Sequence, residues 1–190
     1  MRPLTTTLFT TKLDAVSVGV AKRSAGLLMY RMRQSGPELL LVHPGGPFWA
    51  KKDDGVWSIP KGLYEDEDAL AAAKREFEEE TGCRPRGNFI ALGSFAQPGG
   101  KIVSAWAFEG DFDLASFRSN LFAMEWPPKS GRMAQFPEAD RAGWFAPAEA
   151  MRKIVKGQAP IVDALLMKLG AASGAGAADP QPQKKKHSPS

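Results

Sequence analysis

The chain has 190 residues and a mass of 20.6 kDa, with 43% hydrophobic and 24% charged residues. These values are typical of one soluble globular domain, and they exclude a collagen-like or wholly disordered protein; the single cysteine, Cys83, excludes a disulfide scaffold. The net charge is +4, and about half of it comes from the lysines of the last twelve residues, so charge alone does not predict a DNA-binding face.

The first half of the chain contains strand signals. Two apolar runs, residues 24–32 and 38–44, are separated by a turn sequence that contains Gly36 and Pro37. We expect two strands joined by this turn. After a loop rich in Gly, Pro and Lys, residues 56–62 predict a short strand that ends in a Pro-Lys-Gly turn.

The pattern then changes to a helical period. Asp68 is a suitable N-terminal cap, and Leu70, Ala73 and Phe77 form an apolar stripe at helical spacing. Gly82 fits the position at which such a helix stops. This segment therefore predicts an amphipathic helix that packs one face against the core.

Further strands and two helices complete the predicted elements. Strands are expected over residues 88–97, 101–112 and 141–146, and helices over residues 147–155 and 159–169. Strands and helices are mixed without a regular β-α alternation. This order predicts an α+β fold in which helices cover a sheet.

These elements predict one folded domain over residues 16–169. Residues 1–15 are expected to be weakly ordered, and residues 170–190 to form a disordered basic tail, because the tail lacks an apolar period. No apolar stretch approaches the roughly 20 residues that cross a bilayer, and the N-terminus lacks the apolar segment of a signal peptide. We therefore expect a cytoplasmic protein without a membrane partner.

Three carboxylates of the predicted helix share one face. Glu76 and Glu80 are four residues apart, and Glu79 follows Glu76 by three, whereas Glu78 points elsewhere. Like charges on one patch repel each other, so a divalent cation such as Mg²⁺ would explain why they are grouped. The helix alone leaves a solvated acidic face as an equally open alternative.

The sequence around these carboxylates resembles the Nudix box, the signature of the Nudix hydrolases. Glu67 is followed by seven residues and then by REFEEETGC (residues 75–83), which matches the family pattern position by position. Four residues separate Gly62 from Glu67, one fewer than in the pattern. The resemblance extends over about residues 20–169. It implies the Nudix fold, a mixed β-sheet sandwiched between α-helices.

The resemblance also implies a chemistry and roles for the residues of the box. The implied activity is hydrolysis of a nucleoside diphosphate linked to another moiety, with Mg²⁺ or Mn²⁺ as the cofactor. Glu76, Glu79 and Glu80 would hold the metal, and Glu67 would pair with Arg75 to hold the loop against the helix.

Four residues outside the helix are candidates for the same site. A carbonyl of the Lys61-Gly62 turn would be an additional metal ligand, and Lys61 would stabilise the diphosphate unless it is a solvated turn residue. Glu138 lies six residues before Trp144, much as in relatives that trim RNA 5′ ends, and is a candidate metal ligand or base. A surface acid is an equally open reading of Glu138, and Glu125 is a second candidate.

The substrate is less constrained than the reaction. The segment before the box, HPGGPFWAKKDDGVWSIPKG (residues 43–62), resembles the corresponding segment of pyrophosphohydrolases that act on diadenosine polyphosphates and nucleoside triphosphates. These two compounds are therefore the expected substrate classes. An RNA 5′ end is a further candidate, and the oligomeric state is not predicted. Five aromatic residues offer planes for a base, of which we expect at most one or two to serve: Phe48, Trp49, Trp57, Trp106 and Trp126.

A non-catalytic alternative remains. A Nudix domain can bind a nucleotide or an RNA 5′ end as a sensor, and the shortened loop after Gly62 mildly favours that function. The intact set of Glu76, Glu79 and Glu80 argues against it, since such domains commonly lose these carboxylates. His43 is expected to be a strand-end or pocket-edge residue, and Cys83 a buried apolar one.

Overall fold

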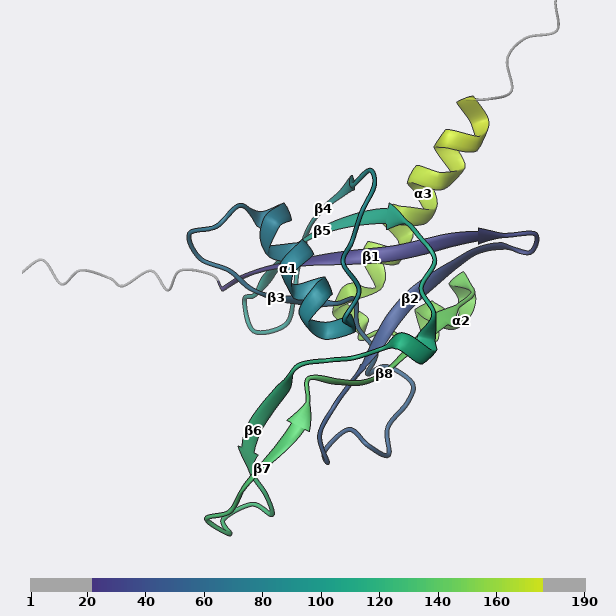
Figure 1. Cartoon of the computed structure of the whole chain (residues 1–190). Helices are drawn as coiled ribbons and strands as arrows, with labels where there is room; N and C mark the ends of the chain where they lie inside the picture. The colour runs from purple at the N-terminus through teal and green to yellow at the C-terminus, as the bar shows by residue number, and fades with distance from the viewer. Residues whose placement is uncertain (1–21, 176–190) are drawn as a thin grey trace, which may run out of the picture.

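The computed structural model describes residues 22–175, which form a six-stranded mixed sheet, a two-stranded hairpin and three α-helices (Figure 1). The six-stranded sheet contains β1 (Arg23–Arg33), β2 (Gly36–Pro44), β3 (Lys61–Leu63), β4 (Ile90–Ala96), β5 (Ile102–Glu109) and β8 (Ala139–Phe145). The hairpin consists of β6 (Leu121–Glu125) and β7 (Met133–Pro137). The helices are α1 (Ala69–Thr81), α2 (Pro147–Lys153) and α3 (Ala159–Ala175), with short 3₁₀ turns η1 (Leu114–Ser116) and η2 (Lys156–Gln158).

Strand β1 is the centre of the sheet, whose order is β4-β5-β1-β2-β8 with β3 attached to β1. One edge of β1 pairs in parallel with β5 along most of its length. The opposite edge is shared, because the start of β1 pairs with β3 and its end pairs with β2. Strands β1 and β2 therefore diverge.

The segment that leads to β3 fills the space between the diverging strands. The Leu27 N–H donates to the Pro60 carbonyl over 3.1 Å, and Val42 and Ser58 exchange backbone hydrogen bonds of 2.9 and 3.0 Å. This pairing fixes the direction in which the chain enters the Lys61-Gly62 turn. The predicted strand over residues 56–62 is thus an isolated bridge followed by the short strand β3.

Both faces of the sheet are covered by helices. Leu28 and Tyr30 of β1 belong to a core with α2 and α3, whereas Leu27 and Met29 belong to a second core with Phe77 of α1. Because both faces are buried, β1 is a continuous apolar run rather than an alternating one. The arrangement confirms the predicted α+β class, with a mixed sheet sandwiched between helices.

Helix α1 begins and ends where the sequence predicts. The Asp68 carboxylate accepts a hydrogen bond of 2.9 Å from the Ala71 N–H, which caps the first turn. Gly82 adopts the left-handed conformation, with φ of 73°, and its N–H donates to the Glu78 carbonyl. Phe77 is fully buried and meets Phe108 edge to face, so the apolar stripe anchors α1 to the sheet.

The hairpin β6–β7 has no counterpart among the predicted elements. Its strands alternate between exposed and half-buried residues, and neither contains a fully buried one. In Figure 1 the hairpin extends away from the sheet. A segment that buries so little apolar surface carries little of the periodicity by which strands are predicted.

The end of the domain also differs from the prediction. Helix α3 continues to Ala175, whereas the tail was predicted to begin at residue 170. The alanines after Gly170 favour the helical conformation, which explains the extension. Residues 1–15 and the rest of the predicted tail lie outside the described residues. Within residues 22–175, no helix is both long and apolar enough to span a bilayer.

A buried glutamine fixes the segment before the Lys61-Gly62 turn. Gln158 in η2 is 2% exposed, and its Oε1 accepts a hydrogen bond of 3.0 Å from the Ile59 N–H. Ile59 is fully buried, so water does not replace this acceptor. The connection between α2 and α3 thus fixes the position of the segment that leads into β3.

Replacing Gln158 with Leu should leave the buried Ile59 N–H without a partner. We expect the free energy of unfolding to fall by about 1–3 kcal/mol, measured by urea denaturation. Lys156→Ala, an exposed position in the same turn, is the control and should change stability by less than about 0.5 kcal/mol. Equal losses in the two variants would show that the hydrogen bond is not the cause.

Candidate active site

Two glycines allow β1, β3 and α1 to approach closely. A Cβ atom at Gly62 would overlap the carboxylate carbon and oxygens of Glu76, so this carboxylate occupies the space of the missing side chain. A Cβ at Gly26 would lie 2.7 Å from the Lys61 Cβ and 2.8 Å from the Pro60 carbonyl oxygen. Gly62 therefore lies at the helical carboxylates although its loop to Glu67 is one residue short. Sequence reasoning missed Gly26, whose signal was a glycine inside an apolar strand.

Arg75 connects three of the carboxylates. Its Nη2 donates to the Glu67 Oε1 over 2.6 Å, and its Nη1 donates to the Glu76 Oε1 over 2.7 Å and to the Glu79 Oε2 over 3.2 Å. The hydrogen bond with Glu67 is the main cause that raises the pKa of Arg75. The Arg75 and Glu67 side chains are 40% and 38% exposed, so their pairing positions the loop more than it stabilises the fold.

Glu80 lies on the same face of α1, beside Lys61. Burial raises the pKa of Glu80 to about 8, and the charges of Glu76 and Glu138 add to this increase. The Lys61 ammonium and a hydrogen bond from the Lys61 backbone act in the opposite direction. Burial also raises the pKa of Glu76, against the effect of Arg75. The positive charges of Arg75 and Lys61 thus do not offset the effect of burial on the pKa of these two carboxyl groups.

Glu138 comes to this group from the base of the hairpin, directly after β7. Its N–H donates to the Asn120 carbonyl over 2.8 Å, and the Asn120 N–H donates to the Glu79 carbonyl over 3.0 Å. Its charge acts on both Glu76 and Glu80, so the tertiary structure brings it to the helical carboxylates. Glu125 does not join them, because its carboxylate accepts from the Gly131 N–H at the turn of the hairpin.

His43 lies at the end of β2, as one of the two expected placements has it, and it is buried rather than at a pocket edge. Its Nδ1 lies 2.7 Å from the Asp140 Oδ1, and its Nε2 lies 2.8 Å from the Lys52 carbonyl oxygen. The ring thus ties the loop after β2 to β8. Cys83 is partly buried against the core, and burial raises the pKa of its thiol, which disfavours a nucleophilic thiolate.

The donor set fits a hard divalent cation, although the ligands are not assembled. Among residues 22–175, no group of three or more His, Cys, Asp and Glu side chains forms a ready metal site. Arg75 holds Glu76 and Glu79, and Lys61 accompanies Glu80. Carboxylate oxygens are the donors that Mg²⁺ prefers. The missing side chain at Gly62 leaves room for the Glu76 carboxylate between β3 and α1.

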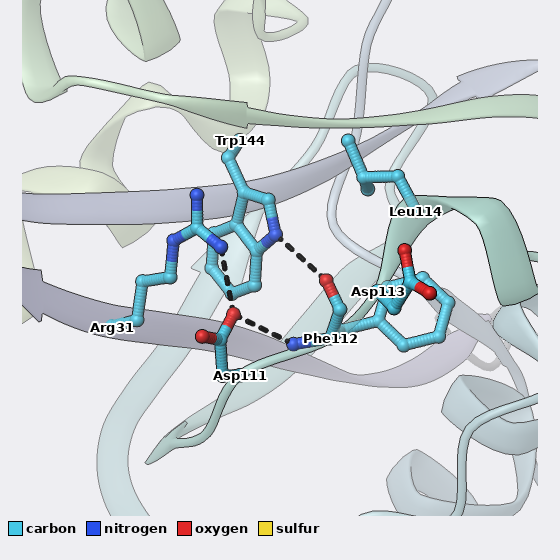
Figure 2. Close-up of a pocket in the computed structure, with 6 residues that line it drawn as sticks. All are labelled: Arg31, Asp111, Phe112, Asp113, Leu114 and Trp144. Atoms are coloured by element: carbon cyan, nitrogen blue, oxygen red, sulfur yellow. Dashed lines mark hydrogen bonds and ion pairs between the residues drawn. The ribbon is translucent and has the colours of Figure 1, made fainter.

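A cavity of about 580 Å³ lies elsewhere, and none of these carboxylates lines it (Figure 2). Its polar groups satisfy one another: Arg31 pairs with Asp111 and lies over the Trp144 ring, and the Trp144 indole N–H donates to the Phe112 carbonyl. Asp113 and Leu114 complete the lining. These contacts make the cluster a structural one, so we do not assign the site to this cavity.

Comparison with known proteins decides the family. The family model described as "NUDIX domain" matches residues 20–165. The chain belongs to the Nudix family. It is thereby placed among the Nudix hydrolases, which act on phosphoric anhydride bonds. No curated protein gives a significant match.

Solved structures show the same fold at low sequence identity. The Ap4A hydrolase of C. elegans, in a binary complex, has 20% identity and a TM-score of 0.56, covering 78% of this chain and 98% of that chain. A mutT/nudix family protein from Listeria innocua has 17% identity and a TM-score of 0.55, covering 81% and 97%. The NUDIX domain of Shewanella oneidensis NrtR, complexed with ADP ribose, has 13% identity and a TM-score of 0.53, covering 83% and 94%.

Replacing Gly62 with Ala should displace the Glu76 carboxylate. The colliding atoms are the mobile end of a side chain, so we expect the melting temperature to change little, while hydrolysis falls at least tenfold as one carboxylate is moved. Gly170→Ala, in open space on α3, is the matched control and should keep full activity. A large loss of stability in Gly62→Ala would show that the backbone, not the carboxylate, had moved.

Replacing Glu80 with Gln should stabilise the metal-free protein at high pH. Folding raises the pKa of Glu80 from 4.5 to about 8, so the fold loses stability as the pH rises between these values. Gln carries no charge, and the variant should exceed the parent by several kcal/mol, up to about 5, above the folded pKa and match it near pH 4.5. Urea denaturation across this pH range in EDTA measures the difference. A difference independent of pH would contradict the assignment.

Proposed function

We propose that the protein is a Mg²⁺-dependent pyrophosphohydrolase that cleaves a nucleoside triphosphate or a diadenosine polyphosphate. The observation that carries the proposal is the close approach of Gly62 to the Glu76 carboxylate, on the face of α1 that also carries Glu80 and that the charge of Glu138 reaches. The fold shared with the C. elegans Ap4A hydrolase is consistent with this substrate class.

The chain supplies ligands for a cation and charges for a diphosphate. Glu76, Glu79, Glu80 and Glu138 would hold Mg²⁺ or Mn²⁺, which neutralises phosphate oxygens and lowers the pKa of bound water. The Lys61 ammonium lies close enough to Glu80 to influence its pKa and would bind a diphosphate oxygen on the same side.

Arg75 and Glu138 would have separate tasks. Arg75 contacts Glu67, Glu76 and Glu79 together, and it would orient the two helical carboxylates while fixing the loop before α1. Glu138 is exposed and reaches the site from outside the helix. A carboxylate in that position can complete the cation site or accept the proton of an attacking water.

A sensor that binds a nucleotide without cleaving it is the second candidate. The NrtR NUDIX domain, which shares the fold, was solved with ADP ribose. In the present structure, the Arg75 guanidinium donates hydrogen bonds to one carboxylate oxygen of Glu76 and one of Glu79. In a sensor these ion pairs would persist when the nucleotide binds, whereas in a hydrolase the cation would compete for the same oxygens.

Hydrolysis by the full chain tests the proposal. We expect Mg²⁺-dependent turnover of nucleoside triphosphates or diadenosine polyphosphates, with ADP ribose and a triphosphorylated RNA 5′ end as competing candidates, measured by chromatography of the products. Excess EDTA should abolish turnover. Binding of a nucleotide without turnover in Mg²⁺ or Mn²⁺ would favour the sensor.

Two matched helix variants test the carboxylates. Glu80→Gln should lower the turnover rate by about 10²–10⁴-fold, because it removes ligand charge where phosphate charge must be neutralised. Glu78→Gln makes the same change at an exposed position of α1 and should retain nearly the parent rate. Initial rates are compared at saturating Mg²⁺. Similar losses of rate in both variants would contradict a metal-binding role for the face of α1 that carries Glu80.

A further inference from the structure

The loop after β2 and the hairpin β6–β7 are joined at the place where Glu138 leaves the hairpin. The Gly45 N–H donates to the Glu138 carbonyl over 2.9 Å. A Cβ at Gly45 would overlap the Pro137 carbonyl oxygen, and a Cβ at Gly46 would lie 3.4 Å from the Phe122 ring. The loop and the base of the hairpin therefore pack directly on each other beside a proposed site residue.

Two aromatic rings meet where these segments face each other. Phe48 of the loop and Trp126 of the hairpin have ring centroids 5.2 Å apart and planes at 87°. Phe48 is 54% exposed, and Trp126 is only partly buried. The two rings thus form a corner with accessible aromatic faces, which we call the aromatic corner. Trp49 differs, because the Lys52 ammonium lies over its ring at 4.6 Å.

The loop is held in this position by several contacts. The Trp49 N–H donates to the Gly46 carbonyl over 3.2 Å, which closes a turn around Phe48. The Lys52 carbonyl is within 2.8 Å of the buried ring of His43, which in turn contacts Asp140. Exposed aromatic rings gain little stability from such ordering, so a ligand is the better explanation for their arrangement.

We propose that the aromatic corner binds the nucleobase of the substrate while its phosphates extend towards Glu138 and the helical carboxylates. This inference rests on the proposed function and adds a subsite to it. A base that stacks on one ring meets the other ring edge-on, and aromatic rings prefer both arrangements. Phe48 is three residues from Gly45, a chain length that spans at most about 10 Å.

The charges around the corner suit an anionic ligand. Lys51 and Lys52 are exposed on the loop, and Lys129 and Arg132 are exposed on the turn of the hairpin. The two acidic residues of the loop are already paired, because Asp53 contacts Lys153 at 2.8 Å and Asp54 contacts Arg152 at 3.2 Å. A nucleotide combines the planar ring and the negative charge that this surface would recognise.

Binding of ADP to the full chain in EDTA tests the subsite without turnover. Titration calorimetry should show that the parent binds ADP more tightly than inorganic pyrophosphate, which has no base. Phe48→Ala should weaken ADP binding by about 5- to 100-fold, the range for loss of one aromatic stacking partner, and leave pyrophosphate binding unchanged. Phe48→Trp keeps an aromatic plane and should retain ADP affinity.

Controls separate the subsite from the fold and from the reaction. Met133→Ala removes another exposed apolar side chain of the hairpin and should bind ADP like the parent. Trp126→Phe should keep ADP affinity, and Trp126→Ala should lose it, with melting temperatures recorded for each variant. Equal ADP affinity in Phe48→Ala and the parent, or a parent that does not distinguish ADP from pyrophosphate, overturns the proposal. Absence of Mg²⁺-dependent hydrolysis with these binding results intact would overturn only the hydrolase function.

Discussion

The contact between Gly62 and Glu76 exists only because β1 and β2 diverge. Their separation admits the segment before β3, which pairs with both strands and then turns towards α1. At that turn the helix lies so close that any side chain at residue 62 would displace the Glu76 carboxylate. The position of the helix is fixed independently by Phe77 in the core, so the turn and the carboxylate share one small space. The rest of the site is arranged around this contact.

This arrangement buries carboxyl groups whose ionised forms the protein alone does not fully stabilise. Arg75 contacts two helical carboxylates and Lys61 accompanies a third, yet the pKa values of Glu76 and Glu80 remain raised by burial. Such a group destabilises the metal-free fold at neutral pH and above. Functional sites often retain destabilising groups of this kind, because a bound cation or ligand compensates for them.

The proposed carboxylate site and the proposed base subsite lie on different parts of the molecule. The sheet and α1 hold the carboxylates through buried contacts on both faces. The loop after β2 and the hairpin β6–β7 bury little apolar surface, yet they meet at the aromatic corner and at Glu138. Segments of this type vary more easily than the core, and they are where selection among related substrates is expected to arise.

The elements whose signals are local could be predicted from the sequence. Asp68, the Phe77 stripe and Gly82 define α1, and the spacing of the three glutamates within that helix places them on one face. The apolar runs of β1 and β2 were equally clear, because each strand is buried on both sides. These features depend on residues within a few positions of one another, so periodicity and capping are sufficient to predict them.

Long-range packing, in contrast, selects the distant residues that reach that helix. Glu138 is about sixty residues from α1 in the sequence and approaches it through Asn120, while Gly26 permits β3 to pack against β1. The hairpin β6–β7 and the contact of Phe48 with Trp126 depend on the same long-range packing. Such contacts arise from how whole layers fit together, and no local pattern of residue types records them.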